Sequence, residues 1–287
     1  MPDTGAIARR VEQHYTRRDL GAALLGALVA AGKDPDHLRP QDLAPVDEFH
    51  VRGREATLEL GRLVGLDPSQ HVLDVGSGLG GPSRCLAVEF GCRVTGVDLT
   101  DEYCRVAAML AERTGLSERV AYRHGDALAL PFGDASFDVV WTQHAAMNIE
   151  DKPRLYAELA RVLAPGGRLA IYDVLAGPAG PPHFPVPWAR EPATSFLVAP
   201  AELRRLLAAA GFDIVSWRDT TALGRDWFRA MARRLAEAGP PPLGFHLLLG
   251  ADFAVMAENM RRNLEEDRVA LIEVVGHRPP GGARGGE

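Results

Sequence analysis

The chain has 287 residues, of which 46% are hydrophobic and 24% are charged, and its formal net charge is −6. This size and apolar content are sufficient for one α/β domain with insertions, without a metal or disulfide to hold it together. The acidic balance and the lack of a basic run argue against nucleic-acid binding, which depends on clustered Lys and Arg. The three cysteines lack the spacing of zinc ligands, which predicts no metal site and is typical of a cytoplasmic protein.

The N-terminal part of the chain lacks the alternation that strands show, and its apolar positions recur at helical spacing. We expect three helices here, over residues 7–16, 20–32 and 53–64. The segment 33–45 is rich in proline and aspartate and is expected to be a connector. The apolar stretch 20–31 is shorter than the roughly 20 residues that cross a bilayer, so no membrane segment is predicted.

From residue 71 the pattern changes to alternating strands and helices. Short apolar runs predict seven strands, over 72–75, 93–98, 119–123, 137–142, 168–173, 212–218 and 269–276. Amphipathic segments lie between them, with the later helices expected over 201–210, 225–238 and 251–265. This alternation predicts a doubly wound parallel sheet with helices on both faces. In such a sheet the ligand lies at the carboxyl ends of the strands.

These patterns divide the chain into three parts. We expect an N-terminal helical cap over 1–66, a main domain over 67–278 and a disordered tail over 279–287. Within the main domain, the Pro- and Gly-rich segment 176–200 shows no clear element, and segment 222–266 is a helical insertion. Long irregular segments in compact domains often form lids or binding loops. We therefore expect both to cover an acceptor.

A glycine-rich loop, GSGLGG at 76–81, follows the first predicted strand and permits a ligand to approach the backbone closely. With Gly81 as the third glycine, the loop fits the dinucleotide fingerprint G-x-G-x-x-G. With Gly80 as the third, it fits the form G-x-G-x-G. Asp98, at the end of the second strand and about 20 residues further on, would accept ribose hydroxyls in either case. The loop and Asp98 predict a nucleotide-type ligand and leave open which one.

Four further features favour the G-x-G-x-G form over the dinucleotide fingerprint. Asp74 occupies a position where the dinucleotide fingerprint normally has an apolar residue, and an acid there suits an ammonium group. Gly125-Asp126-Ala127 follows the third strand and places a carboxylate where an adenine amino group would donate. The segment 130–140 runs into the fourth strand, and 161–169 forms the helix-to-strand turn before the fifth.

In this order and at these spacings, the segments resemble the motifs of class I S-adenosylmethionine-dependent methyltransferases over roughly residues 50–277. The resemblance implies a Rossmann-like seven-stranded sheet whose last strand is antiparallel and lies beside the fifth. It also implies S-adenosylmethionine as the cofactor. The expected cofactor-binding residues are Asp74, Gly76, Ser77, Gly78 and Gly80 at the methionine part, Asp98 at the ribose, Leu99, Asp126 and Ala127 at the adenine, and Gln143 and His144 after the fourth strand.

Segments 78–83, 141–152 and 259–264 resemble the sarcosine/dimethylglycine N-methyltransferase-like branch, which is similar to enzymes acting on phosphoethanolamine, tocopherols and sugars. The resemblance implies a small-molecule acceptor, with an amine nitrogen slightly favoured. O- or C-methylation of a phenolic, quinol or natural-product acceptor is the alternative. Outside this class, an NAD-dependent oxidoreductase would leave the motifs at 125–127 and 165–167 unexplained, and a non-catalytic cofactor binder is a third possibility.

Methyl transfer from a sulfonium has an already activated leaving group, so the enzyme mainly orients and desolvates the reactants. His144, just past the fourth strand, is the candidate catalytic base or acceptor-orienting group, and packing on the cofactor is the alternative. The candidate acceptor-binding residues are Tyr15, Met147, Asn148, Tyr172, Trp188 and Arg190. Core packing is the alternative for Tyr172, and a solvated loop position is the alternative for Arg190. We expect a cytoplasmic monomer or homodimer that binds neither nucleic acid nor membrane.

Overall fold

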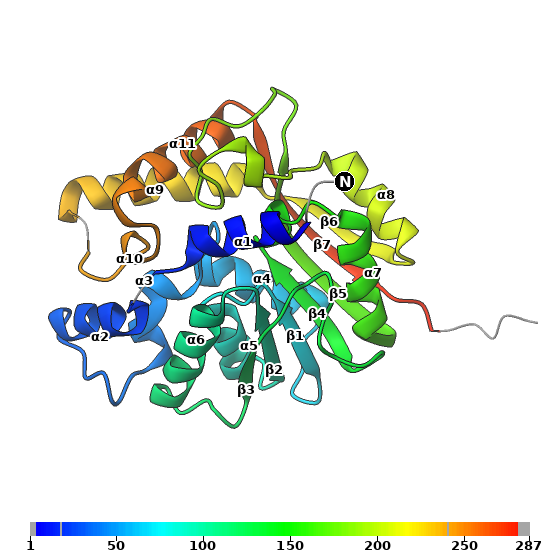
Figure 1. The fold of residues 1–287 in the computed structure, drawn as a ribbon, viewed down its shortest axis with the longest axis horizontal. Helices are drawn as coiled ribbons and strands as arrows, with labels where there is room; N and C mark the ends of the chain where they lie inside the picture. The colour runs from blue at the N-terminus through cyan, green and yellow to red at the C-terminus, as the bar shows by residue number, and fades with distance from the viewer. Residues whose placement is uncertain (1–3, 18, 240, 281–287) are drawn as a thin grey trace, which may run out of the picture.

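The computed structural model describes residues 4–17, 19–239 and 241–280. A seven-stranded sheet in the order β3-β2-β1-β4-β5-β7-β6 forms its centre (Figure 1). The strands are β1 (His71–Val75), β2 (Arg93–Asp98), β3 (Val120–His124), β4 (Phe137–Gln143), β5 (Leu163–Ala176), β6 (Asp213–Asp219) and β7 (Val269–His277). β7 pairs antiparallel with β5 and with β6, and the pairs among β1 to β5 are parallel. The predicted fold and the antiparallel last strand beside β5 are confirmed.

Successive residues of each buried strand point to opposite faces of the sheet, and apolar side chains lie on both. Helices therefore cover both faces. Val72 and Val139 pack on one face with apolar side chains of α4 (Gly53–Val64) and α5 (Gly81–Glu89). Leu73 and Val140 pack on the other face with α7 (Lys152–Val162) and α8 (Pro200–Ala209). α6 (Asp101–Arg113) follows β2 and contacts β2 and β3.

The N-terminal region forms a third, smaller core against α6. Leu20, Leu24 and Leu28 of α2 (Leu20–Ala30) are buried there, together with side chains from α6 and from α10 (His246–Leu249). The expected connector contains two short elements that the sequence analysis missed, η1 (Pro40–Leu43) and α3 (Ala44–Asp47). Each is four residues long, which is too short for a hydrophobic period to reveal. In Figure 1, α1 (Thr4–Tyr15) crosses between the sheet and the helices α9 (Thr221–Ala238) and α11 (Phe253–Glu265).

The two expected lid segments are joined by buried asparagines of α11. Asn263 accepts from the His183 backbone N–H at 2.7 Å and donates to the His183 carbonyl at 3.1 Å. Asn259 donates to the Pro185 carbonyl at 2.9 Å. Segment 176–200 contains one short helix, η3 (Pro192–Thr194), and η4 (Gly250–Asp252) precedes α11. The proposed domain division and the lid role of these segments stay predictions.

The described elements differ from the expected ones mainly at their ends. β5 is longer than predicted at both ends. Residues 174–176 continue its antiparallel ladder with residues 269–271 of β7, and Leu163 at its start pairs with Phe137 of β4. The expected tail, 279–287, lies mostly outside the described residues. None of the helices in the described part of the chain is long and apolar enough to cross a membrane.

Candidate active site

A cavity of about 370 Å³ lies at the carboxyl ends of β1 to β4, a volume typical of small-molecule sites. The sheet order places it where the strand order reverses, between β1 and β4. Loops from all four strands line it, as do side chains of α1 and of the segment before α4. Four segments of the main domain contribute to the wall, over residues 75–79, 97–100, 125–128 and 143–145.

The glycine loop forms one wall of the cavity. Its backbone is anchored to β2, because Gly76 and Ser77 both donate to the Val97 carbonyl, at 2.8 and 3.1 Å. Gly76 and Gly78 have left-handed φ angles of 78° and 53°, which glycine adopts without strain. A Cβ on Gly76 would lie 2.5 Å from the Ala145 Cβ, whereas a Cβ on Gly78 would meet no atom within 4 Å. Gly78 therefore presents bare backbone to open space in the cavity.

Asp98 fixes the same loop from the end of β2. One carboxylate oxygen accepts from the Gly78 N–H and the other accepts from the Thr100 N–H, both at 2.8 Å. Burial raises the pKa of this carboxyl, and the two backbone donors oppose that rise. A carboxylate has about four lone-pair positions, so acceptor capacity remains for a ligand.

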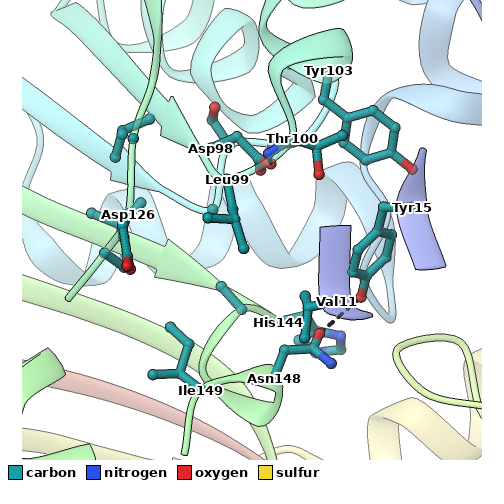
Figure 2. Close-up of a pocket in the computed structure, with 18 of the residues that line it drawn as sticks. Val11, Tyr15, Asp98, Leu99, Thr100, Tyr103, Asp126, His144, Asn148 and Ile149 are labelled. Carbon is teal, nitrogen blue, oxygen red and sulfur yellow. Dashed lines mark hydrogen bonds between the residues drawn. The ribbon is translucent and has the colours of Figure 1, made fainter. Parts of the chain in front are cut away.

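The end of the cavity beyond β3 is formed by Asp126, Ala127 and Leu128. An Asp126 carboxylate oxygen accepts from the Leu128 N–H at 2.8 Å, which orders this turn. His124 is hydrogen-bonded to the Leu99 carbonyl at 2.9 Å and joins the turn after β3 to that after β2. Figure 2 shows Leu99 pointing into the cavity, with Asp126 on one side and Tyr15 on the other.

Four side chains that line the cavity have a buried polar atom without a hydrogen-bond partner among the described residues. These atoms are Ser77 Oγ, Tyr103 Oη, Gln143 Nε2 and His144 Nε2. Buried polar atoms are normally paired, so their gathering at one cavity indicates a polar ligand. The Trp141 indole donates to Gln143 Oε1 at 2.9 Å, which leaves the Gln143 amide N–H groups as the free donors.

His144 follows β4 directly, in a left-handed conformation with φ 47°. Its backbone N–H donates to the Tyr172 carbonyl at 2.8 Å, which carries β4–β5 pairing one residue further. Its pKa lies well below 6.5, first because of burial and second because of the charge on His50. The imidazole of His144 is therefore neutral at physiological pH and can accept a proton.

Tyr15 and Asn148 close the cavity from α1 and from the short helix η2 (Ala146–Asn148). The Tyr15 hydroxyl donates to Asn148 Oδ1 at 2.9 Å, as the dashed line in Figure 2 shows. The Asn148 amide donates to the carbonyls of Trp188 and Thr194, at 2.8 and 3.0 Å. Asn148 thus links α1 to the 176–200 segment across the cavity.

Two residues expected to bind the cofactor lie behind the cavity wall instead. Asp74 is buried on the α5 face of the sheet, where it accepts from the Ser83 hydroxyl at 2.6 Å. Burial raises its pKa to about 7. Asp74 points to this face because Leu73 and Val75 occupy the other. Gly80 packs against the Tyr122 hydroxyl, and a Cβ at Gly80 would overlap it.

Four residues expected to contact the acceptor do not line the cavity. Met147 and Tyr172 are buried in the core on the α4 and α5 face. Trp188 is also buried and its indole donates to Ser195 Oγ at 2.9 Å. Arg190 forms an ion pair with Asp252 of η4. The Trp188 contact lies within segment 176–200, and the Arg190 contact joins this segment to segment 222–266; neither reaches the cavity.

The segment before α4 also lines the cavity, with Asp47, Phe49 and His50. The sequence patterns did not predict this. Asp47 forms a fully buried ion pair with Arg84 of α5, and this pair joins α3 to the helix that follows the glycine loop. The available signal was an acid and a histidine, Glu48 and His50, between apolar residues. Periodicity could not reveal it because Glu48 and His50 lie outside any regular element, and Asp47 ends a helix of only four residues. Among the described residues, no group of three His, Cys, Asp or Glu is placed to hold a metal ion.

Residues 73–171 match the family model described as a methyltransferase domain. A curated relative, methyltransferase GfsG of Streptomyces halstedii, is 34% identical over 171 residues, which cover 59% of this chain and 59% of the relative. The first curated relatives are matched over 28 to 59% of their own lengths. Further curated relatives carry the names of O- and C-methyltransferases.

Solved structures share the fold over a larger part of the chain. The [4+2]-cyclase SpnF is 26% identical, with a TM-score of 0.68 over 96% of this chain and 97% of that one. Phosphoethanolamine N-methyltransferase 2 of Haemonchus contortus, solved with S-adenosyl-L-methionine, is 21% identical, with a TM-score of 0.70 over 82% of this chain and 54% of that one. Residues 73–171 are thus a methyltransferase domain, and the sheet order and the cavity at the ends of β1 to β4 resemble those of class I S-adenosylmethionine-dependent methyltransferases, which indicates S-adenosylmethionine as the cofactor.

Proposed function

We propose that the chain transfers the methyl group of S-adenosylmethionine to a hydroxyl group of a small, uncharged acceptor. The observation that carries this proposal is His144, a buried and neutral histidine that lines the cavity with an unpartnered Nε2. A hydroxyl must lose its proton during methylation, and a positioned base typically contributes 10²–10⁴-fold to such a reaction. An amine loses its proton to solvent beforehand and needs no such residue.

The charges around the cavity support an acceptor without a carboxylate or phosphate. Arg154 is the one Arg or Lys among the described lining residues, and its Nε donates to the Leu128 carbonyl at 2.7 Å, beside Asp126. The described lining near His144 therefore offers no guanidinium or ammonium to pair with an acceptor anion. This moves our preference from the glycine-derived amines that the sequence favoured toward hydroxyl acceptors, which the O-methyltransferase relatives also support.

The chemistry follows from these placements. Bound S-adenosylmethionine supplies a methyl group on a sulfonium, open to in-line attack. The 76–79 loop, Asp98 and the 125–128 turn would hold the cofactor, with Ser77 Oγ and Gln143 Nε2 available as further partners. His144 would take the acceptor's hydroxyl proton while the new carbon–oxygen bond forms and the carbon–sulfur bond breaks. The Tyr15–Asn148 contact would exclude water, which strengthens the polar interactions inside.

An acceptor screen with methyl-labelled S-adenosylmethionine tests this proposal. Phenols, quinols and sugar hydroxyls form one arm, while sarcosine, dimethylglycine and phosphoethanolamine form the other. We expect label transfer in the first arm, and transfer confined to the amines would contradict the hydroxyl assignment. Calorimetric titration with S-adenosylmethionine and with NAD is the companion measurement. Cofactor binding without methyl transfer to any acceptor would contradict the proposed activity, since the cyclase neighbour shows that this fold supports other chemistry.

A further inference from the structure

A cluster of buried polar side chains from outside the matched methyltransferase segment reaches the end of β4. Glu48 and His50 precede α4, and Thr57 lies on its second turn, whereas the family match begins at residue 73. The His50 and Glu48 side chains are only 2% and 5% exposed. His50 lines the same cavity as His144. Two histidines from distant parts of the chain therefore meet at one end of the site.

The hydrogen bonds of His50 fix its ring. Its Nε2 lies 3.3 Å from Glu48 Oε2 and 3.2 Å from Thr57 Oγ1. Its Nδ1 lies 3.3 Å from the Val51 carbonyl oxygen. A carboxylate and a carbonyl are acceptors only, so both contacts are satisfied when both ring nitrogens carry a proton. These contacts hold the His50 ring edge-on against the Glu48 carboxylate.

His50, His144 and Tyr172 form a triangle of rings. The centroids of His50 and His144 are 5.8 Å apart in an edge-on arrangement. Those of His50 and Tyr172 are 5.9 Å apart, and those of His144 and Tyr172 are 4.8 Å apart. The Thr57 hydroxyl donates to the Glu48 carboxylate, and its Oγ1 also lies 3.2 Å from Gln143 Oε1, next to His144 in the chain. The cluster therefore lies against the His144 ring and against its neighbour Gln143.

We propose that His50, held by Glu48 and Thr57, is a positioning residue that holds the His144 ring in place and keeps it unprotonated for the acceptor's proton. The inference deepens the proposed methyl transfer and rests on it for the role of His144. A cation close to His144 disfavours a second positive charge there. Burial alone would act in the same direction, so the contribution of His50 has to be measured separately.

Other charged and titratable groups surround these two rings and set the background for such a measurement. Glu48 lies beside His50 in the same segment, and Tyr172 of β5 lies beside His144. Farther out, Arg52 pairs with Glu59 at 2.7 Å and lies 3.5 Å from Glu273 of β7. Arg218 of β6 also pairs with Glu273, at 3.2 Å. Tyr15 of α1 lines the same cavity, and its hydroxyl donates to Asn148. A substitution at His50 alone replaces none of these side chains, but it leaves the Glu48 carboxylate without its His50 partner.

The decisive experiment measures the pKa of His144 by NMR titration of the full-length protein without cofactor, in the wild type and in His50→Phe. Phenylalanine keeps an aromatic ring in the triangle but removes the charge. We expect the His144 pKa to rise by about two units, which is the effect of a unit charge at this distance at an effective dielectric of about 20. In methyl transfer, the acidic limb of kcat/KM should move to higher pH by the same amount. The KM for S-adenosylmethionine should change less than kcat.

His50→Gln provides a second variant that keeps a donor toward Glu48, and it replaces His50→Phe if that protein does not fold. His71→Gln is the matched control, because His71 is half-buried beside Phe137 at the amino end of β1, and the cavity lies at the carboxyl end of this strand. An unchanged His144 pKa in a folded His50 variant overturns the inference, including when turnover is lost. The NMR readout needs no acceptor, so it distinguishes this failure from a failure of the proposed methyl transfer.

Discussion

The two ends of the cavity are built in different ways. At the cofactor end, the loops after β1, β2 and β3 supply the wall, and backbone hydrogen bonds such as those from Gly78 and Thr100 to Asp98 define it. At the His144 end, the wall combines β4 with the segment before α4 and with α1. Side-chain contacts between distant segments hold it together, as between Tyr15 and Asn148.

The two ends of the cavity should therefore respond differently to substitution. The cofactor end depends on a local backbone shape that a short motif encodes, so its disruption should weaken cofactor binding. The other end depends on packing between the N-terminal region and the main domain, so its disruption should reduce turnover or stability. The buried Asp47–Arg84 pair is the main polar link between these regions close to the glycine loop. Four substitutions test this separation.

The largest effect is expected for His144→Gln. Removal of the proposed base should lower kcat by about 10²–10⁴-fold, the usual contribution of such a group. The Kd for S-adenosylmethionine, measured by calorimetry, should stay within about twofold, because the backbone at the cofactor end is untouched. His37→Gln, at a highly exposed position, is the control. Intact turnover in His144→Gln would remove the base role.

Asp47→Asn tests the link between the two regions. It leaves the fully buried Arg84 without a counter-charge, and loss of one partner of a buried pair typically costs about 3–5 kcal/mol. The free energy of unfolding should be measured by urea denaturation at pH 8, above the pKa of about 6 to which burial raises Asp47. Because this rise means that burial disfavours the ionised carboxylate, its removal offsets part of the loss. Asp101→Asn, in an exposed pair with Arg105, should change it by less than about 1 kcal/mol. Equal effects of the two substitutions would show that the link is unimportant.

Asp98→Ala should act on the cofactor end. We expect the Kd for S-adenosylmethionine to increase by roughly 10–150-fold, equivalent to about 1.5–3 kcal/mol for hydrogen bonds to a charged group. The substitution removes the acceptor for the Gly78 N–H as well as the proposed ribose contact. Asp134→Ala, on an exposed side chain paired with Arg161, is the control in the same titration. Unchanged affinity would mean that the ribose lies elsewhere.

The smallest effect on affinity is expected for Asp74→Asn, since Asp74 does not line the cavity. Its folded pKa of about 7 lies above the ordinary 3.8, so the ionised carboxylate destabilises the folded state above pH 7. This penalty decreases as the pH falls through 7 toward 3.8. Asparagine should therefore raise the free energy of unfolding by about 1–2 kcal/mol at pH 8 and by less at pH 5. A Kd increase as large as that of Asp98→Ala would instead place Asp74 at the ligand.

The sequence predicted most of the fold because its strands and helices carry strong local patterns. α4 and β2 have the predicted bounds, and the glycine loop and the Asp98 position are encoded within short segments. The cofactor end follows from these, because the carboxyl ends of neighbouring parallel strands meet at one edge of the sheet. Gly76, Ser77, Gly78, Asp98, Leu99 and Asp126 all line the cavity as that rule requires.

Tertiary structure decided what a motif cannot express. It directed Asp74 to the α5 face, and it joined Trp188 to Ser195 and Arg190 to Asp252 instead of turning them to the cavity. It also brought His50 beside His144, although 93 positions separate them in the chain. The physical reason is that such contacts depend on how the N-terminal region packs on the sheet. The sequence by itself therefore determined the sheet and the cofactor loop, while the packing of distant segments decided which side chains face the reaction.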